Sequence, residues 1–119
     1  MKGYTNFTKV HAEEFAGSAT EAKELKGAAI STLDKSFAVD TTLTGVEALA
    51  VTATATAASK SLVLGVKDGQ VLLVANVGNT NAFTLKGITG DSGTSLATGK
   101  VALVIGSTTA NATKIYVLN

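Results

Sequence analysis

The chain lacks cysteine, proline, arginine and tryptophan, and its only histidine is His11. Without cysteine it can form neither a disulfide framework nor a thiolate metal site. Without arginine, and with its lysines scattered over a chain of formal net charge +1, it has no basic patch of the kind that nucleic-acid-binding proteins use. One histidine among dispersed carboxylates does not give the ligand spacing of a metal site. We therefore expect no nucleic-acid partner, no metal and no cofactor.

Long apolar runs are missing as well. The longest, VALVIG beginning at Val101, is far shorter than the ~20 residues that a membrane helix needs. The N-terminal sequence MKGYTNFTKVHAEEF lacks the apolar segment of a secretion signal. These two absences predict a soluble protein without a membrane partner.

What the chain does contain is suited to β-structure. Hydrophobic residues make up 45% of its 119 residues and are mostly Ala, Val and Leu, and Thr and Gly are frequent among the others. This composition favours short β-strands separated by turns of small residues. The length suits one domain rather than two.

The N-terminal part differs from the rest. The capping-box pattern Ser18–Glu21 opens a predicted short helix over Ala19–Leu25, a segment of good helix formers. Upstream of it, residues 1–17 follow neither a helical nor a strand period. We therefore predict an N-terminal arm with one short helix over residues 1–35 and a β-domain over residues 36–119.

The β-domain is predicted to be a small β-sandwich or jelly roll. In the segment GVEALAVTATAT, larger apolar residues alternate with small or polar ones, as in a half-buried strand. The predicted strands are Phe37–Asp40, Val46–Thr54, Ser61–Val66, Gln70–Asn76, Ala82–Lys86, Val101–Gly106 and Thr113–Leu118.

Two pairs of these strands have the sequence of hairpins. Lys67–Gly69 separates two apolar runs, and its Asp-Gly pair is a strong turn signal. Gly78–Asn81 joins the next pair, and Gly and Asn tolerate positive φ. Since the chain has no proline, its edge strands must be protected by lysines, by bulges or by a neighbouring subunit.

The tetrapeptide Gly-Asp-Ser-Gly at residues 90–93 matches the sequence around the nucleophile of chymotrypsin-like serine proteases. By that resemblance, Ser92 would be the nucleophile, and the N–H groups of Gly90 and Ser92 would bind the oxyanion. The chain is too short for the two barrels of that fold, and His11 lies outside any predicted strand. We therefore expect no catalytic residue and no enzymatic activity. The motif is interpreted as a polar turn in which Asp91 caps local N–H groups.

The stretch Asp68–Leu118 resembles phage head fibre and capsid decoration proteins. The resemblance rests on the segments DGQ, NVGNTNAFTL, SLATGKVALVIGST and KIYVL, and AKELKGAAI upstream is also similar. It implies a non-enzymatic β-domain on the virion surface, made in the host cytoplasm and commonly a homotrimer. It also implies that the N-terminal part attaches to the shell of the major capsid protein.

The candidate capsid contacts are the large apolar residues of the arm, Tyr4, Phe7, Val10 and Phe15. They follow no period and are not predicted to join the β-core. Exposed together they would promote aggregation, which favours cover by a partner. The alternative is a disordered tail without a role. Val/Leu-rich strands such as VALVI also need cover on more than one face, which favours an oligomer.

The sequence is compatible with two other functions. One is a fibre-tip domain that recognises a surface glycan, for which a concave patch of exposed aromatic rings would be needed. Phe83 or Tyr116 could stack on a sugar, although packing in the core or in an interface is the other interpretation of both. The second is a hydrolase that acts through Ser92.

Overall fold

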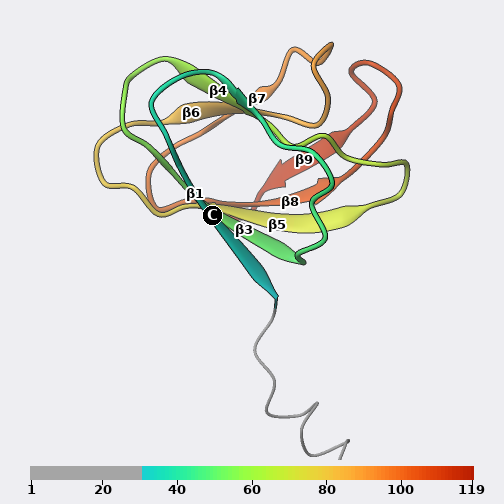
Figure 1. The fold of residues 1–119 in the computed structure, drawn as a ribbon, viewed down its shortest axis with the longest axis horizontal. Coiled ribbons are helices and arrows are strands. Elements are labelled where there is room, and N and C mark those ends of the chain that lie inside the picture. Colours follow the sequence, from blue (N-terminus) through green and yellow to red (C-terminus); the bar gives the residue numbers. More distant parts are fainter. Residues whose placement is uncertain (1–30) are drawn as a thin grey trace, which may run out of the picture.

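The structure, a computed structural model, describes residues 31–119, which form two β-sheets packed face to face (Figure 1). The predicted mainly-β sandwich is thereby confirmed, and these described residues contain no helix. The five-stranded sheet has the order β1 (Thr32–Phe37), β3 (Ala50–Ala55), β5 (Val71–Asn76), β8 (Val101–Ile105) and β9 (Lys114–Val117). The four-stranded sheet has the order β2 (Thr41–Thr42), β4 (Lys60–Val63), β6 (Phe83–Lys86) and β7 (Thr94–Leu96). The predicted helix over Ala19–Leu25 lies outside the described residues.

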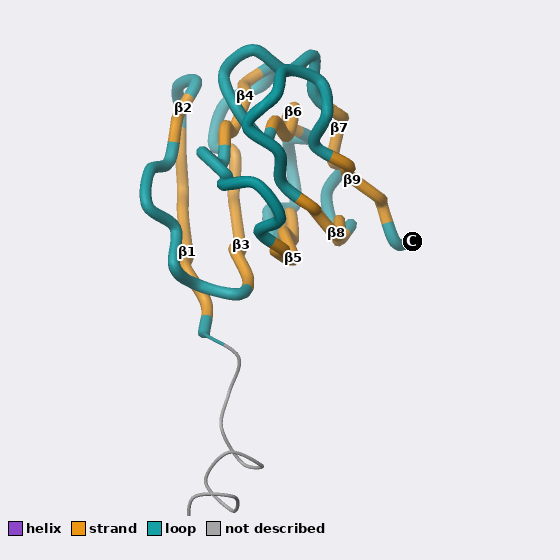
Figure 2. Tube along the Cα trace, turned by 90° about the vertical axis from the view of Figure 1, so that its right-hand side faces the viewer, coloured by secondary structure: helices purple, strands orange, loops and turns teal. Residues whose placement is uncertain are grey.

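From β1 to β6 the chain passes from one sheet to the other between every two successive strands. Strands that become neighbours in this way run parallel: β1, β3 and β5 in one sheet, and β2, β4 and β6 in the other. The later strands β7, β8 and β9 are added antiparallel to β6, β5 and β8. Figure 2 shows the two rows of strands from the side, with the connections running between them. The two sheets are therefore joined by repeated crossings of the chain between them.

Neither of the two predicted hairpins forms. The strands on either side of Lys67–Gly69, β4 and β5, belong to different sheets, and so do β5 and β6 on either side of Gly78–Asn81. Leu64 and Val66 are buried in the core directly after β4, so this segment carries the chain across the sandwich instead of reversing it. A turn signal predicts a change of direction, but it does not predict which strand becomes the neighbour.

Each of the seven predicted strands overlaps an observed one, and the strands that were not predicted are short. The first strand begins at Thr32, four residues before the predicted start of the β-domain at residue 36. Its sequence TLDKSF buries only Phe37, because β1 is an edge strand. β2 and β7 were not predicted, since two or three residues are too few to show alternation.

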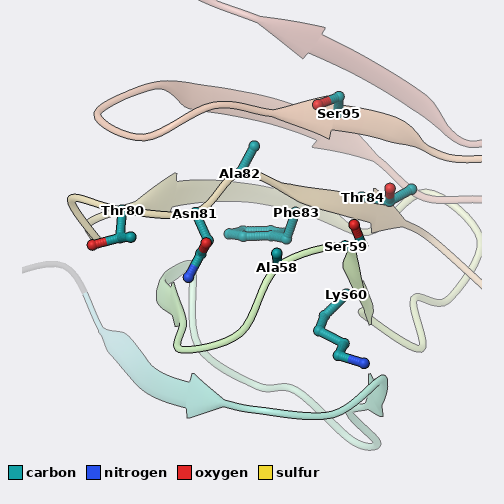
Figure 3. Close-up of a pocket in the computed structure, with 9 residues that line it drawn as sticks. All are labelled: Ala58, Ser59, Lys60, Thr80, Asn81, Ala82, Phe83, Thr84 and Ser95. Atoms are coloured by element: carbon teal, nitrogen blue, oxygen red, sulfur yellow. The ribbon is translucent and has the colours of Figure 1, made fainter.

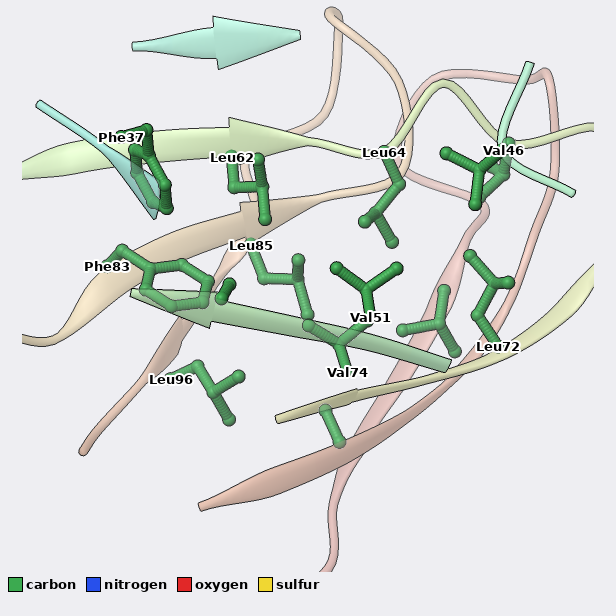
Figure 4. Packing of buried hydrophobic residues seen from close by; sticks show 14 of the residues in the cluster. Phe37, Val46, Val51, Leu62, Leu64, Leu72, Val74, Phe83, Leu85 and Leu96 are labelled. Carbon is green, nitrogen blue, oxygen red and sulfur yellow. The ribbon is translucent and has the colours of Figure 1, made fainter. Parts of the chain in front are cut away.

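The core lies between the two sheets and is built mainly from aliphatic side chains (Figure 4). In β3 the buried residues Val51, Ala53 and Ala55 alternate with partly exposed ones, as predicted for a strand with one face inward. Phe37 and Phe83 meet edge to face with ring centroids 5.3 Å apart, an arrangement that adds to the stabilisation from burial. The largest fully buried side chains are Leu62, Leu64, Leu72, Leu85, Leu96, Val51, Val74, Val104 and Asn76.

Asn76 is the polar member of that buried set, with 1% of its surface exposed. Its side-chain amide donates to the carbonyl oxygens of Asn81 and Leu96, each at 3.0 Å. Its side-chain oxygen accepts from the N–H of Gly78 at 3.0 Å. Asn76 ends β5 and Leu96 ends β7, so this one amide ties a strand of each sheet to the intervening loop.

Candidate functional site

The motif at residues 90–93 lies in the loop between β6 and β7 and is organised around the buried carboxylate of Asp91. One carboxylate oxygen, Oδ2, accepts from the N–H groups of Gly87 at 2.9 Å and Ile88 at 3.1 Å. The other, Oδ1, accepts from the N–H of Asn111 at 2.6 Å. The predicted polar turn with a capping Asp91 is therefore confirmed. The carboxylate also reaches further than predicted, because Asn111 belongs to the loop between β8 and β9.

Ser92 and Gly93 have structural explanations of their own. Ser92 is exposed, and its N–H donates to the side-chain oxygen of Asn111 at 2.7 Å, so this N–H is already used within the protein and is not free to bind an oxyanion. Gly93 has φ of +86°, and a Cβ there would lie against Thr84 and Lys86. Glycine is required at this position by backbone geometry and space. His11 lies outside the described residues.

A small open cavity of about 190 Å³ lies beside Ser92. Asp91 is the only ionisable residue among those that line it, and its oxygens accept the three hydrogen bonds already described. The lining residues are Asp91, Ser92, Gly93, Thr94, Asn111, Thr113 and Ile115. The described residues thus place no free base next to the Ser92 hydroxyl.

We predict that Ser92→Ala leaves the protein chemically and structurally unchanged. The side chain is exposed and the loop is held by backbone groups, so the free energy of unfolding should change by well under ~1 kcal/mol. Urea denaturation measures this change. Labelling of the wild type by a fluorophosphonate probe, abolished in both Ser92→Ala and His11→Ala, would contradict the interpretation.

A second carboxylate, Asp68, ties the turn before β5 to the loop after β8. It accepts from the backbone N–H of Thr108 at 2.7 Å and from the Thr108 hydroxyl at 3.0 Å. These bonds, the backbone one first, hold the pKa of Asp68 below its usual range because they favour the charged carboxylate.

The lowered pKa of Asp68 predicts a pH dependence of stability. The Thr108 bonds contribute fully above the unfolded-state pKa of about 4, and the contribution is lost as the pH falls through the lower folded-state pKa. Asp68→Asn should therefore unfold at a slightly lower temperature than the wild type at pH 7, with the difference shrinking in acid. Thermal unfolding of both proteins, followed by circular dichroism at pH 7 and in acid, tests this. A difference in unfolding temperature that grows on acidification would contradict the prediction.

A polar cleft of about 330 Å³ lies between the β3–β4 and β5–β6 loops (Figure 3). Hydroxyl, amide and ammonium groups of Ser59, Lys60, Thr80, Asn81, Thr84 and Ser95 line it, together with Ala58, Ala82 and Phe83. Phe83 has only 2% of its surface exposed and pairs with Phe37, so its ring belongs to the core. The cleft therefore lacks the exposed aromatic ring that a glycan reader would use for stacking.

The sequence prediction did not locate an apolar surface that lies on the outer face of the five-stranded sheet. Leu49, Val71, Ile105, Tyr116 and Leu118 are all more than one-third exposed there. Tyr116 is thus neither in the core nor in the polar cleft. The signal was present in VALVI: Ala102 and Val104 face the core, whereas the alternate residues of β8 face outward. We call this surface the outer β-face.

The predicted capsid contacts Tyr4, Phe7, Val10 and Phe15 all lie outside the described residues. Within residues 31–119, no three histidine, cysteine or acidic side chains lie together as metal ligands would. In the same range no helix is long and apolar enough to cross a membrane. No family model, curated protein or solved structure matches the chain.

Proposed function

We propose that the chain is a non-enzymatic structural protein of a phage virion, a head fibre or capsid decoration protein attached to the major capsid protein by its N-terminal segment. The observation that carries the proposal is the resemblance of Asp68–Leu118 to such proteins. That stretch makes up strands β5 to β9 and the loops that hold them.

The use of polar groups in this stretch supports a structural role. Asn76 and Asp91 are its two buried polar side chains, and both are hydrogen-bonded to backbone groups that fix loops. Asp68 does the same at the surface. These three polar side chains therefore hold loops of the β-domain in place by hydrogen bonds.

The direct test is the composition of purified phage particles. Mass spectrometry of particles purified by sedimentation should find the protein as a stoichiometric component that remains bound through the gradient. Its absence from washed particles, with free protein in the lysate, would refute the proposal.

The attachment role of the arm gives a separate prediction. A variant that begins at Ser18 lacks Tyr4, Phe7, Val10 and Phe15 while retaining all of residues 31–119. It should keep the thermal midpoint of the full chain and fail to occupy particles that lack the protein. Equal capsid occupancy by the full and shortened chains would show instead that the arm is a tail without a role.

The resemblance implies a homotrimer, and the number of copies stays a prediction. Light scattering at micromolar concentration measures it, and a stable monomer would remove the claim of self-association.

A further inference from the structure

The outer β-face has a regular arrangement that follows from the strand register. Leu73 of β5 lies beside Leu103 of β8, which lies beside Tyr116 of β9. On the next row Val71 lies beside Ile105, which lies beside Lys114 of β9. On this same face β3 presents Thr52 and Thr54 and β1 presents Asp34 and Ser36, all polar. The apolar part thus lies on three adjacent strands together with Leu49, directly before β3. A polar margin on β3 and β1 bounds it on one side, and Lys114 of β9 lies at the opposite edge.

The size of this apolar part is that of an interface. Four of its side chains are about half exposed or more: Leu49 by 59%, Val71 by 51%, Tyr116 by 51% and Leu118 by 54%. With Ile105 and the partly exposed Leu73, Val101 and Leu103, the patch offers on the order of 600 Å² of apolar surface, at the upper limit for a stable monomer. Two such patches together reach ~1,200 Å², the lower limit for a specific interface.

The face also contains both a hollow and a projecting side chain. The hollow has a volume of about 310 Å³ and is lined by Leu49, Val71, Leu72, Leu73 and Leu103. Tyr116, the projecting side chain, is one strand further along the same row as Leu73 and Leu103. Sheets that pack face to face lie ~10 Å apart with interdigitating side chains, so a projection and a hollow on one face can serve two copies at once.

We propose that the outer β-face binds the same face of a second copy of this chain, about a twofold axis that runs along β8. Such an axis places Leu103 opposite Leu103 of the second copy. It exchanges β5 and β9, because these strands flank β8. Tyr116 of each copy then lies over Leu73 of the other, in the hollow.

The same rotation explains the polar margin. Strands β1 and β3 lie on the far side of β5 from β8, so they fall outside the overlap and face solvent. The overlap therefore contains the three strands that carry most of the apolar outer residues and leaves out β1 and β3. Lys114, at the edge of the overlap, lies over Val71 of the second copy. An isologous contact of this kind closes after two copies and does not propagate into a filament.

This inference does not depend on a virion role, and it differs from the homotrimer that the resemblance implies. Light scattering and sedimentation equilibrium of the full chain, up to about 100 µM for an interface of this small size, should give the mass of a dimer. A monomer throughout that range, or a trimer, would overturn the twofold contact.

Single substitutions locate the contact. Leu103→Lys sets two charges against each other on the axis and should give a monomer. Ser36→Lys, on the polar margin of the same face, should remain a dimer. A Leu103→Lys protein that still dimerises would overturn the proposal. If circular dichroism shows that Leu103→Lys does not fold, Tyr116→Lys is used instead. The Tyr116 side chain is half exposed, so its replacement should not disturb the fold.

The absence of cysteine from the chain allows a direct geometric test. Leu103→Cys places one thiol near the axis in each copy, and a short bis-maleimide should join two copies covalently. Ser36→Cys, outside the overlap, should give little cross-linked product under the same conditions. Equal cross-linking of the two variants would contradict the proposed axis.

Discussion

Replacement of Asn76 by Asp is expected to lower the free energy of unfolding by about 4 kcal/mol at neutral pH, a large part of a small domain's stability. The Asn76 amide nitrogen donates to the carbonyl oxygens of Asn81 and Leu96 in the closed interior. In Asn76→Asp a carboxylate oxygen would face those two oxygens, and the buried charge would keep only the N–H of Gly78 as a donor. Urea denaturation measures the change.

Two comparisons separate the charge from the lost hydrogen bonds. Asn76→Ala removes the donors without adding charge and should cost about 2 kcal/mol, the effect of leaving buried carbonyl groups unsatisfied. The penalty of Asn76→Asp should fall in acid, because a protonated carboxyl can donate to one of the carbonyls. Asn79→Asp, an exposed change in the same loop, should alter stability by less than ~0.5 kcal/mol. Similar losses for Asn76→Asp and Asn79→Asp would show that the buried amide is unimportant.

Asp91→Ala is expected to destabilise the protein by about 3 kcal/mol, because one substitution leaves three backbone N–H groups without their acceptor. The N–H groups of Gly87 and Ile88 hold the turn after β6, and that of Asn111 holds the loop between β8 and β9. We expect amide hydrogen exchange to become faster at all three N–H groups, and to a greater extent than in the core strands.

Asp40→Ala is the matched control for Asp91→Ala. Asp40 is exposed and accepts one backbone bond, from Ser61 at 3.0 Å, so its removal should cost no more than ~1 kcal/mol. If the two variants lost equal stability, or if exchange quickened at Gly87 and Ile88 but not at Asn111, Asp91 would not join the two loops as described.

The sequence predicted those features that depend on residues close together in the chain. The alternation in β3 predicted its buried face, and the glycine-rich surroundings of Asp91 predicted a capped turn. The role of Asn76 could not be predicted in this way, because the sequence showed it only as the last residue of a predicted strand. Its role depends on Leu96, twenty residues away and in the other sheet.

The prediction of which strands pair was wrong for a related reason. The pattern of β5 is the same whether its neighbours are β4 and β6, as predicted, or β3 and β8, as observed. Alternation records which side of a strand is buried, but it contains no information about the strand across the hydrogen bonds. VALVI was predicted to need cover on more than one face, as β8 does. The extent of the outer β-face could not be predicted, because its other apolar residues come from segments that are neighbours only after folding.

The repeated crossing of the chain between the two sheets has a consequence for how the protein folds. A parallel pair such as β1 and β3 joins residues 18 positions apart, Thr32 with Ala50, and each such pair requires an excursion through the opposite sheet. Contacts of this separation must be formed against the entropy of loop closure, so we expect folding in milliseconds to seconds rather than microseconds. Neither sheet can be completed before the other is well advanced. Once formed, they should open together, which favours resistance to proteolysis between the strands.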